Sequence, residues 1–255
     1  KGIIQQYKAD FVKYEHNDKK LKIISIYDSI PPQLNKQNRR FIFTMLNKEL
    51  KFDRYENSFL WLKEAAVAIP VYIVDELQSP LIMSKATNVF KLFMSDVGLL
   101  TSNYPNFVSR DLLNGNIENE LNNGALFENY VAQELICSDI TPYYFKNQKI
   151  GEIDYLIEYN NQIIPLEVKS GSNYKKHKAL VNLLEKFAST INKAYVLSVS
   201  NIQVEANITY LPIYLVGLFK EEENTAKFDG NVKVTVDEVV IKSPRAEAYV
   251  DAESH

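Results

Sequence analysis

The chain has 255 residues, of which 46% are hydrophobic and 24% charged, a globular composition that suits one large domain or two modest ones. No apolar run approaches the roughly 20 residues that cross a bilayer, no signal-peptide pattern opens the chain, and the single cysteine, Cys137, excludes an internal disulfide. The net charge of −3 is uneven, because residues 221–255 hold nine acids and four bases and leave a mildly basic body. We therefore expect a cytoplasmic protein without membrane contact, whose body can meet an anionic polymer.

Residues 1–98 are predicted to form a helical domain that ends in a β-ribbon. The expected helices are Leu21–Ile30, which stops at Pro31-Pro32, then Gln33–Leu50, with Ile42, Met45, Leu46 and Leu50 on one face, and Arg54–Ile69, which Pro70 ends. The expected strand-like segments are Val71–Glu76, Pro80–Met83 and Phe90–Asp96. Three helices followed by a ribbon are the order of a winged helix, in which one helix enters the major groove of DNA.

The second predicted helix carries a basic cluster away from its apolar face, formed by Lys36, Arg39 and Arg40. Such a cluster fits contact with DNA phosphates. Basic residues also commonly solvate the outer face of an amphipathic helix, and the sequence leaves both interpretations open.

Residues 99–220 indicate an α/β layer. An Asn- and Gly-containing linker leads into a helix, Ala125–Ile136, where Cys137 follows and is expected to be buried. A hairpin, an amphipathic helix (Lys175–Ser189) and an apolar strand (Lys193–Val199) come next. His177 lies in a charged stretch and is expected at the surface. The acidic tail, residues 221–255, either forms a small hairpin or is an appendage.

The hairpin GEIDYLIEYNNQIIPLEVKSG places charged residues among apolar ones. A two-residue turn at Asn160-Asn161 would set Asp154 directly across from Glu167, and Glu152 across from Lys169. Alternation then puts the charged residues on one face. The opposite, buried face receives Ile153, Tyr155, Ile157, Ile164, Leu166 and Val168.

Opposed acids at this spacing repel, so one carboxylate should protonate or both should share a cation. Hard oxygen ligands suit Mg²⁺, and a neighbouring lysine could assist phosphate chemistry there. A solvated face with an ion pair such as Glu152–Lys169 is the alternative. Pro165 suits an edge strand or a bulge, and a bulge would shift the register.

Asp154 followed by Glu167-Val168-Lys169 resembles the D…ExK core of the PD-(D/E)xK restriction-endonuclease-like superfamily. FENYVAQEL before the hairpin, and the helix and strand after it, match the αβββαβ order of that superfamily. More widely, segments such as SIPPQLNKQNRRF, FKLFMSDVGLL, GALFENYVAQEL and IIPLEVKSG resemble the C-terminal region of a prokaryotic AAA-type ATPase family over residues 1–220. The fold class implied is α/β (α+β), with a winged-helix-like domain (1–98), a nuclease-like domain (99–220) and the acidic tail (221–255).

The resemblance implies roles for individual residues. Asp154 and Glu167 would bind Mg²⁺ or Mn²⁺, with the Val168 carbonyl as a third ligand, and Lys169 would position the attacking water or the scissile phosphate. Glu128 matches an acid that the superfamily often supplies from its first core helix, although Glu134 is a rival. Lys178 matches a basic residue on the helix after ExK, where simple solvation is the alternative.

No GxxxxGK[ST] motif occurs, so ATP binding by this chain is not expected, and its start inside a helical pattern suggests a fragment of a longer protein. Three functions stay open. The first is a Mg²⁺-dependent nuclease-like domain acting on DNA and linked natively to an ATPase. The second is a non-catalytic DNA-binding module, and the third is a protein-interaction domain that positions the ATPase.

Overall fold

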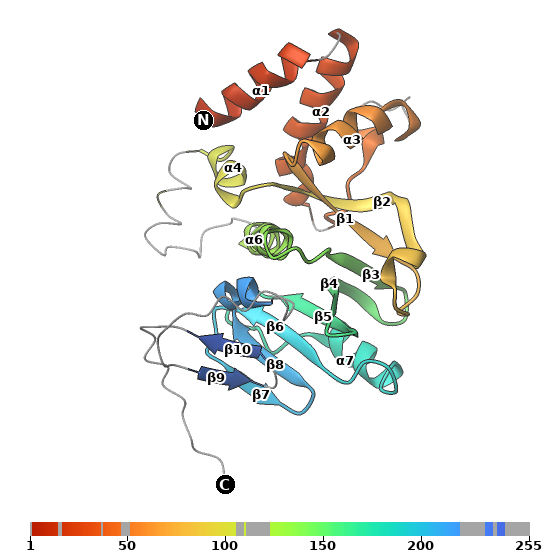
Figure 1. Ribbon diagram of the computed structural model, residues 1–255, viewed down its shortest axis with the longest axis vertical. Coiled ribbons are helices and arrows are strands. Elements are labelled where there is room, and N and C mark those ends of the chain that lie inside the picture. Colours follow the sequence, from red (N-terminus) through yellow and green to blue (C-terminus); the bar gives the residue numbers. More distant parts are fainter. Residues whose placement is uncertain are drawn as a thin grey trace.

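The computed structural model describes residues 2–14, 17–36, 38–46, 52–105, 110, 123–219, 233–236 and 239–242 (Figure 1). The α-helices are α1 (Gly2–Tyr14), α2 (Asn17–Leu34), α3 (Glu56–Glu64), α4 (Val97–Ser102), α6 (Asn123–Cys137) and α7 (Lys178–Lys186). The described residues also form the 3-10 turns η1 (Phe43–Met45), η2 (Phe52–Arg54), η3 (Leu81–Ser84) and η4 (Ile213–Leu218). None of the helices in these ranges is long and apolar enough to cross a membrane.

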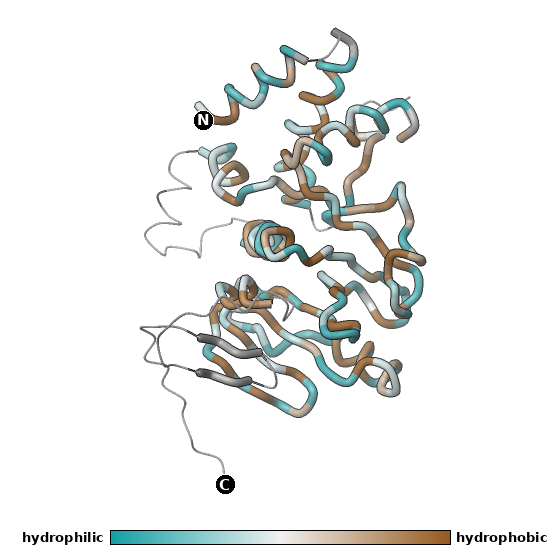
Figure 2. The backbone as a smooth tube through the Cα atoms, in the orientation of Figure 1, coloured by the Kyte–Doolittle hydropathy of each residue, from teal (hydrophilic) through white to brown (hydrophobic). Residues whose placement is uncertain are grey.

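One mixed eight-stranded sheet runs through most of the molecule, in the order β2-β1-β3-β4-β5-β6-β8-β7. Its strands are β1 (Ala68–Val74), β2 (Lys85–Met94), β3 (Tyr143–Asn147), β4 (Gly151–Tyr159), β5 (Gln162–Val168), β6 (Ala194–Ser198), β7 (Gln203–Glu205) and β8 (Ile208–Pro212). The pairs β1–β3, β5–β6 and β6–β8 are parallel, whereas the other four pairs are antiparallel. The strands carry long hydrophobic stretches because both sheet faces are covered (Figure 2).

The two covered faces form two apolar cores. Ile164 packs with α6 and the N-terminal helices on one face, and its neighbour Ile163 packs with α7 on the other. The succession α6, β3, β4, β5, α7, β6 is the predicted αβββαβ order. The α+β fold class expected from the sequence is therefore confirmed, with helices on both sides of the sheet.

The predicted helix Gln33–Leu50 is wrong over its described part. Residues 39–42 are extended, with Phe41 N–H donating to the Phe90 carbonyl at 2.8 Å and Arg40 bridging Lys91 of β2. Phe41 and Phe43 are buried among Phe52, Phe59 and Phe90, while Ile42 and Met45 are exposed. The alternating aromatic pattern, with period 2, thus overrides the helical spacing. Leu50 lies outside the described residues.

Two helix ends also differ from the prediction. Helix α2 continues through Pro31 and Pro32 to Leu34 in spite of the two missing N–H groups, because its buried face, which includes Tyr27 and Ile30, fixes it by packing. Helix α3 ends at Glu64 rather than Ile69, since Ala66 takes a positive φ of 52° and β1 begins at Ala68.

The N-terminal region has the order of three helices and a ribbon, but the ribbon does not stand apart. Strand β1 pairs with β2 on one side and with β3 on the other, so the sheet continues across the predicted boundary at residue 98. The segment Pro80–Met83 is not a strand, because Leu81–Ser84 forms the turn η3. In the tail, β9 (Lys233–Val236) and β10 (Val239–Lys242) pair as an antiparallel hairpin.

Asn129 connects α6 to Met94, the last residue of β2, through two hydrogen bonds. Its fully buried amide accepts from Met94 N–H at 2.9 Å and donates to the Met94 carbonyl at 3.0 Å. Asn129→Ala leaves both backbone groups unpaired, so we expect the free energy of unfolding to fall by about 2–4 kcal/mol in a urea titration. Asn182→Ala, which removes one half-buried bond to the Ile150 carbonyl, should cost about 1 kcal/mol. Equal losses in the two variants would contradict this role.

Candidate functional site

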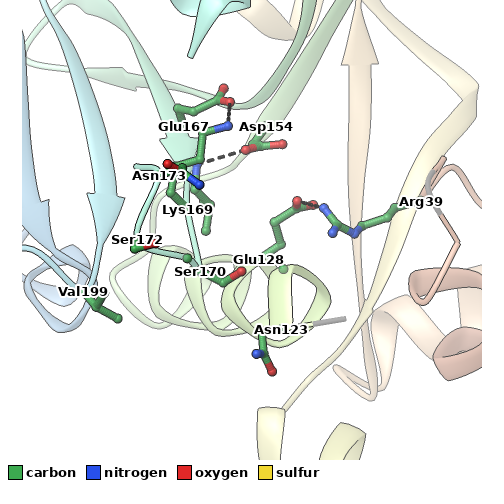
Figure 3. A pocket seen from close by; sticks show the side chains of 13 residues that line it. Arg39, Asn123, Glu128, Asp154, Glu167, Lys169, Ser170, Ser172, Asn173 and Val199 are labelled. Carbon is green, nitrogen blue, oxygen red and sulfur yellow. Dashed lines mark hydrogen bonds and ion pairs between the residues drawn. The ribbon is translucent and has the colours of Figure 1, made fainter. Parts of the chain in front are cut away.

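An open cleft of about 810 Å³ lies where α6 begins and β5 ends (Figure 3). Three acids line it, each from a different element: Glu128 from α6, Asp154 from β4 and Glu167 from β5. The end of β5 with the loop after it, the start of α6 and two more distant residues complete the lining, with Val168, Lys169, Ser170, Gly171, Ser172, Asn173, Asn123, Gly124, Val199 and Arg39. All three acids that the sequence singled out are therefore brought to one place.

The hairpin register places two of these acids. Strands β4 and β5 pair from Tyr159↔Gln162 to Tyr155↔Leu166, which is the predicted register, and Asn160 and Asn161 take the positive φ values of 48° and 58° that the turn requires. Pro165 pairs with Leu156 in this ladder, and the register does not shift there. Gly151 opens β4 with a φ of 110°, and a Cβ there would lie 2.8 Å from Ala179 of α7.

A bulge changes which face the start of β4 presents. Tyr143 of β3 pairs with Leu156 but Phe145 pairs with Ile153, so β4 holds one extra residue beside Tyr144. Ile153 consequently packs with Leu156 in the α7 core, whereas Tyr155 packs in the α6 core. The predicted shared face of Ile153 and Tyr155 is wrong, because simple alternation ignores the extra residue.

Asp154, Glu167 and Lys169 form the base of the cleft. Asp154 Oδ2 accepts the Val168 N–H at 2.9 Å, and Lys169 Nζ donates to Glu167 Oε1 at 2.7 Å. The side chains of Asp154 and Glu167 are 15% and 8% exposed, and Glu167 Oε2 is buried with no hydrogen-bond partner. The charged residues are thus largely desolvated rather than placed on a solvated outer face.

The pKa of Glu167 is raised to about 8. Burial is the largest cause, and the nearby Asp154 carboxylate adds to it, while Lys169 and Lys91 pull the pKa back. The repulsion predicted between the two opposed acids therefore contributes to the raised pKa of Glu167. At neutral pH the Glu167 carboxyl holds a proton that an added cation would displace.

Glu128, rather than its rival Glu134, is the acid that α6 supplies. It is 2% exposed, and Arg39 and Lys91 both bind its carboxylate, Lys91 Nζ at 3.3 Å from Oε2. The Glu128 carbonyl accepts from the buried hydroxyl of Tyr155 at 2.7 Å, which fixes α6 on the sheet. Glu134 does not line the cleft.

Lys91, in β2, is the charged residue of this region that sequence reasoning missed. It is 1% exposed, and its Nζ lies 2.9 Å from Glu152 Oε1 and 3.8 Å from Asp154 Oδ1. Burial alone would raise the pKa of Glu152, but Lys91 and Lys146 lower it below its usual value. The predicted pair Glu152–Lys169 is wrong, since these lysines bind Glu152. The signal was a lone lysine in the apolar run FKLFM.

The predicted nucleic-acid-binding residues do not lie on one surface helix. Arg39 enters the cleft and binds Glu128. Lys36 is exposed in the turn after α2, beside Met45 Sδ, and Arg40 is exposed on the extended segment. Lys178 is exposed at the first turn of α7 and does not line the cleft.

Two further residues correct the sequence reading. His177 is buried, with Nε2 2.9 Å from the Tyr210 hydroxyl, because β8 covers the loop before α7; it is not the surface residue that was expected. Cys137 is exposed at the end of α6 rather than buried.

The donor set at Asp154 and Glu167 fits a hard divalent cation. Glu167 Oε2 is a buried carboxylate oxygen without a partner, and Asp154 lies close enough to raise the pKa of Glu167. The site is a carboxylate pair: within the described ranges no three His, Cys, Asp or Glu side chains are grouped so as to hold a metal ion. Waters and the Val168 carbonyl would have to complete the coordination of Mg²⁺.

Two family profiles match the chain. Residues 123–216 match a domain of unknown function, DUF4143, and residues 1–108 match another, DUF8612. DUF4143 is found in proteins associated with AAA-type ATPases, which is compatible with the resemblance seen in the sequence. No curated protein and no solved structure matches the chain. The two matched segments meet at the cleft, because Arg39 and Lys91, in the DUF8612 match, bind Glu128, in the DUF4143 match.

The raised pKa of Glu167 predicts a pH dependence of stability. Between the ordinary value of 4.5 and about 8, native Glu167 holds a proton that the unfolded chain has released, so stability falls as pH rises through this range. Relative to Glu167→Gln, the unfolding free energy of the wild type should drop by on the order of a few kcal/mol from about pH 5 to about pH 9. Urea titrations in chelator-treated buffer measure this difference. Glu185→Gln, on the exposed face of α7, controls for the loss of one carboxylate, and a parallel pH profile of wild type and Glu167→Gln would refute the expectation.

Proposed function

We propose that the cleft is a Mg²⁺- or Mn²⁺-dependent phosphodiester-cleaving site that acts on DNA. The observation that carries this proposal is the largely buried pair Asp154 and Glu167, with Lys169 beside it, at the base of an open cleft. Their spacing in the chain, within an αβββαβ order, also supports the resemblance to PD-(D/E)xK nucleases.

Each residue of the cleft has a role in this proposal. Asp154 and Glu167 hold the cation, and the Val168 carbonyl is a third oxygen donor. When bound, Mg²⁺ or Mn²⁺ supplies Lewis-acid stabilisation of charge on the phosphate and lowers the pKa of a coordinated water. Lys169, which pairs with Glu167 Oε1 at 2.7 Å, would hold the water or a phosphate oxygen if a cation took its place on Glu167. Glu128 positions Arg39 at the cleft, where its guanidinium can bind a second phosphate.

The partner of this domain in the whole protein is proposed to be an AAA-type ATPase. The resemblance over residues 1–220 and the match to DUF4143 support this link. The nuclease-like domain would then be the output module of the ATPase, and residues 1–98, the winged-helix-like region, would connect the two.

A non-catalytic DNA-binding or protein-interaction module is the second candidate, and one observation favours it. Arg39 and Lys91 already neutralise Glu128, and Lys91 approaches Asp154. Carboxylates compensated in this way need no metal for stability, so the same fold could serve binding alone.

Cleavage of plasmid DNA distinguishes the candidates. With Mg²⁺ or Mn²⁺ we expect the wild type to nick plasmid, and Asp154→Asn or Lys169→Met to slow nicking at least about 100-fold, because each removes a charge at the reacting phosphate. Asp75→Asn and Lys178→Met are matched controls, since both residues are exposed outside the cleft. Equal nicking by wild type and Asp154→Asn, or none by either, would rule out the catalytic proposal.

DNA binding without cleavage tests the second candidate. Arg39→Ala/Arg40→Ala should weaken salt-dependent duplex binding about tenfold by removing two phosphate-binding cations, while Asp154→Ala/Lys169→Ala should retain it. Fluorescence anisotropy over a range of salt concentrations measures both affinities. If wild-type affinity is negligible at low salt, DNA is not the partner, and association with the separately expressed ATPase half becomes the measurement that decides for the interaction module.

A further inference from the structure

Lys91 is a buried cation beside two acids of the cleft, Glu128 and Asp154. It lies in the buried, apolar second half of β2 and is itself almost fully buried. Its ammonium faces oxygens of Glu152 at 2.9 Å, Glu128 at 3.3 Å and Asp154 at 3.8 Å, and Tyr144 covers it at 5.3 Å from the ring centroid. Three carboxylates from α6 and β4 thus surround one nitrogen.

Asp154 is shared between this lysine and the candidate metal pair. Its Oδ1 faces Lys91, whereas Oδ2 accepts the Val168 N–H beside Glu167. A carboxylate placed in this way can serve two cations at once, one on each oxygen. In two-metal phosphodiesterases the two metal ions lie about 3.5–4 Å apart.

We propose that Lys91 is a built-in cation that takes the place of a second divalent ion, so that the cleft binds one ion, between Asp154 and Glu167. This inference rests on the proposed function. The spacing of the cluster supports it, because oxygens at 2.9–3.8 Å suit an ammonium, whereas Mg²⁺ requires about 2.0–2.1 Å.

A fixed lysine has two consequences for the site. It compensates the charges of Glu128 and Asp154 whether or not a metal is bound, since an uncompensated buried cluster of three acids would repel itself. It also makes the N-terminal region part of the site, because β2 supplies the charge that α6 and β4 need.

Counting bound ions tests the inference. Calorimetric titration with Mn²⁺ should give one ion per wild-type chain, and Glu167→Gln should weaken that ion at least tenfold. Lys91→Met/Glu167→Gln should then bind an ion at least tenfold more tightly than Glu167→Gln, because the vacated cluster of Glu128, Glu152 and Asp154 can draw in around Mn²⁺. Lys91→Arg, which keeps the charge, should retain the wild-type count.

If Lys91→Met does not fold, Lys91→Met/Glu152→Gln replaces it, because this pair of changes keeps the net charge of the cluster. It should bind one ion more than Glu152→Gln alone. Two ions on the wild type, or no gain on removing Lys91, would overturn the inference. A wild type that binds no ion contradicts the proposed metal site instead, and the comparison with and without Lys91 still decides whether the lysine excludes an ion.

Discussion

The buried carboxylate of Glu128 is the constraint on which the rest of the structure depends. A charge that is 2% exposed is tolerated only where cations and hydrogen bonds replace water. Its two cations, Arg39 and Lys91, come from segments that lie 89 and 37 residues away in the chain. Meeting this requirement places the extended segment around Arg39 and the strand β2 against α6, and so joins the N-terminal region to the αβββαβ core.

The same charges shape the cleft. Asp154 lies between Lys91, which compensates it, and Glu167, which it disfavours as an anion. Lys91 and the Val168 N–H therefore contact both oxygens of Asp154, whereas Glu167 retains a buried oxygen, Oε2, without a hydrogen-bond partner. The unpartnered Glu167 oxygen is what makes a single added cation chemically reasonable. It also distinguishes the candidate metal pair, Asp154 and Glu167, from the neighbouring salt bridges around Lys91.

The hairpin could be predicted because its information is local. The turn residues Asn160-Asn161 set the register, and the period of two then placed Asp154 near Glu167. The bulge in β4 could not be predicted in the same way, because it depends on the pairing with β3 rather than on β5. The basic cluster failed for a similar reason: Arg39 was assigned to a surface helix, but pairing of residues 40 and 41 with β2 made the segment extended.

The sequence by itself determined the αβββαβ order and the acids of the hairpin, since periodicity, turn residues and side-chain chemistry are properties of short segments. A hard cation between these acids is a proposal drawn from the same chemistry. The tertiary structure alone decided that Lys91 and Arg39 belong to the site and that Lys178 does not. Burial and charge compensation act between segments far apart in the chain. The role of a lysine in an apolar strand can therefore be assigned only when the acids around it are known.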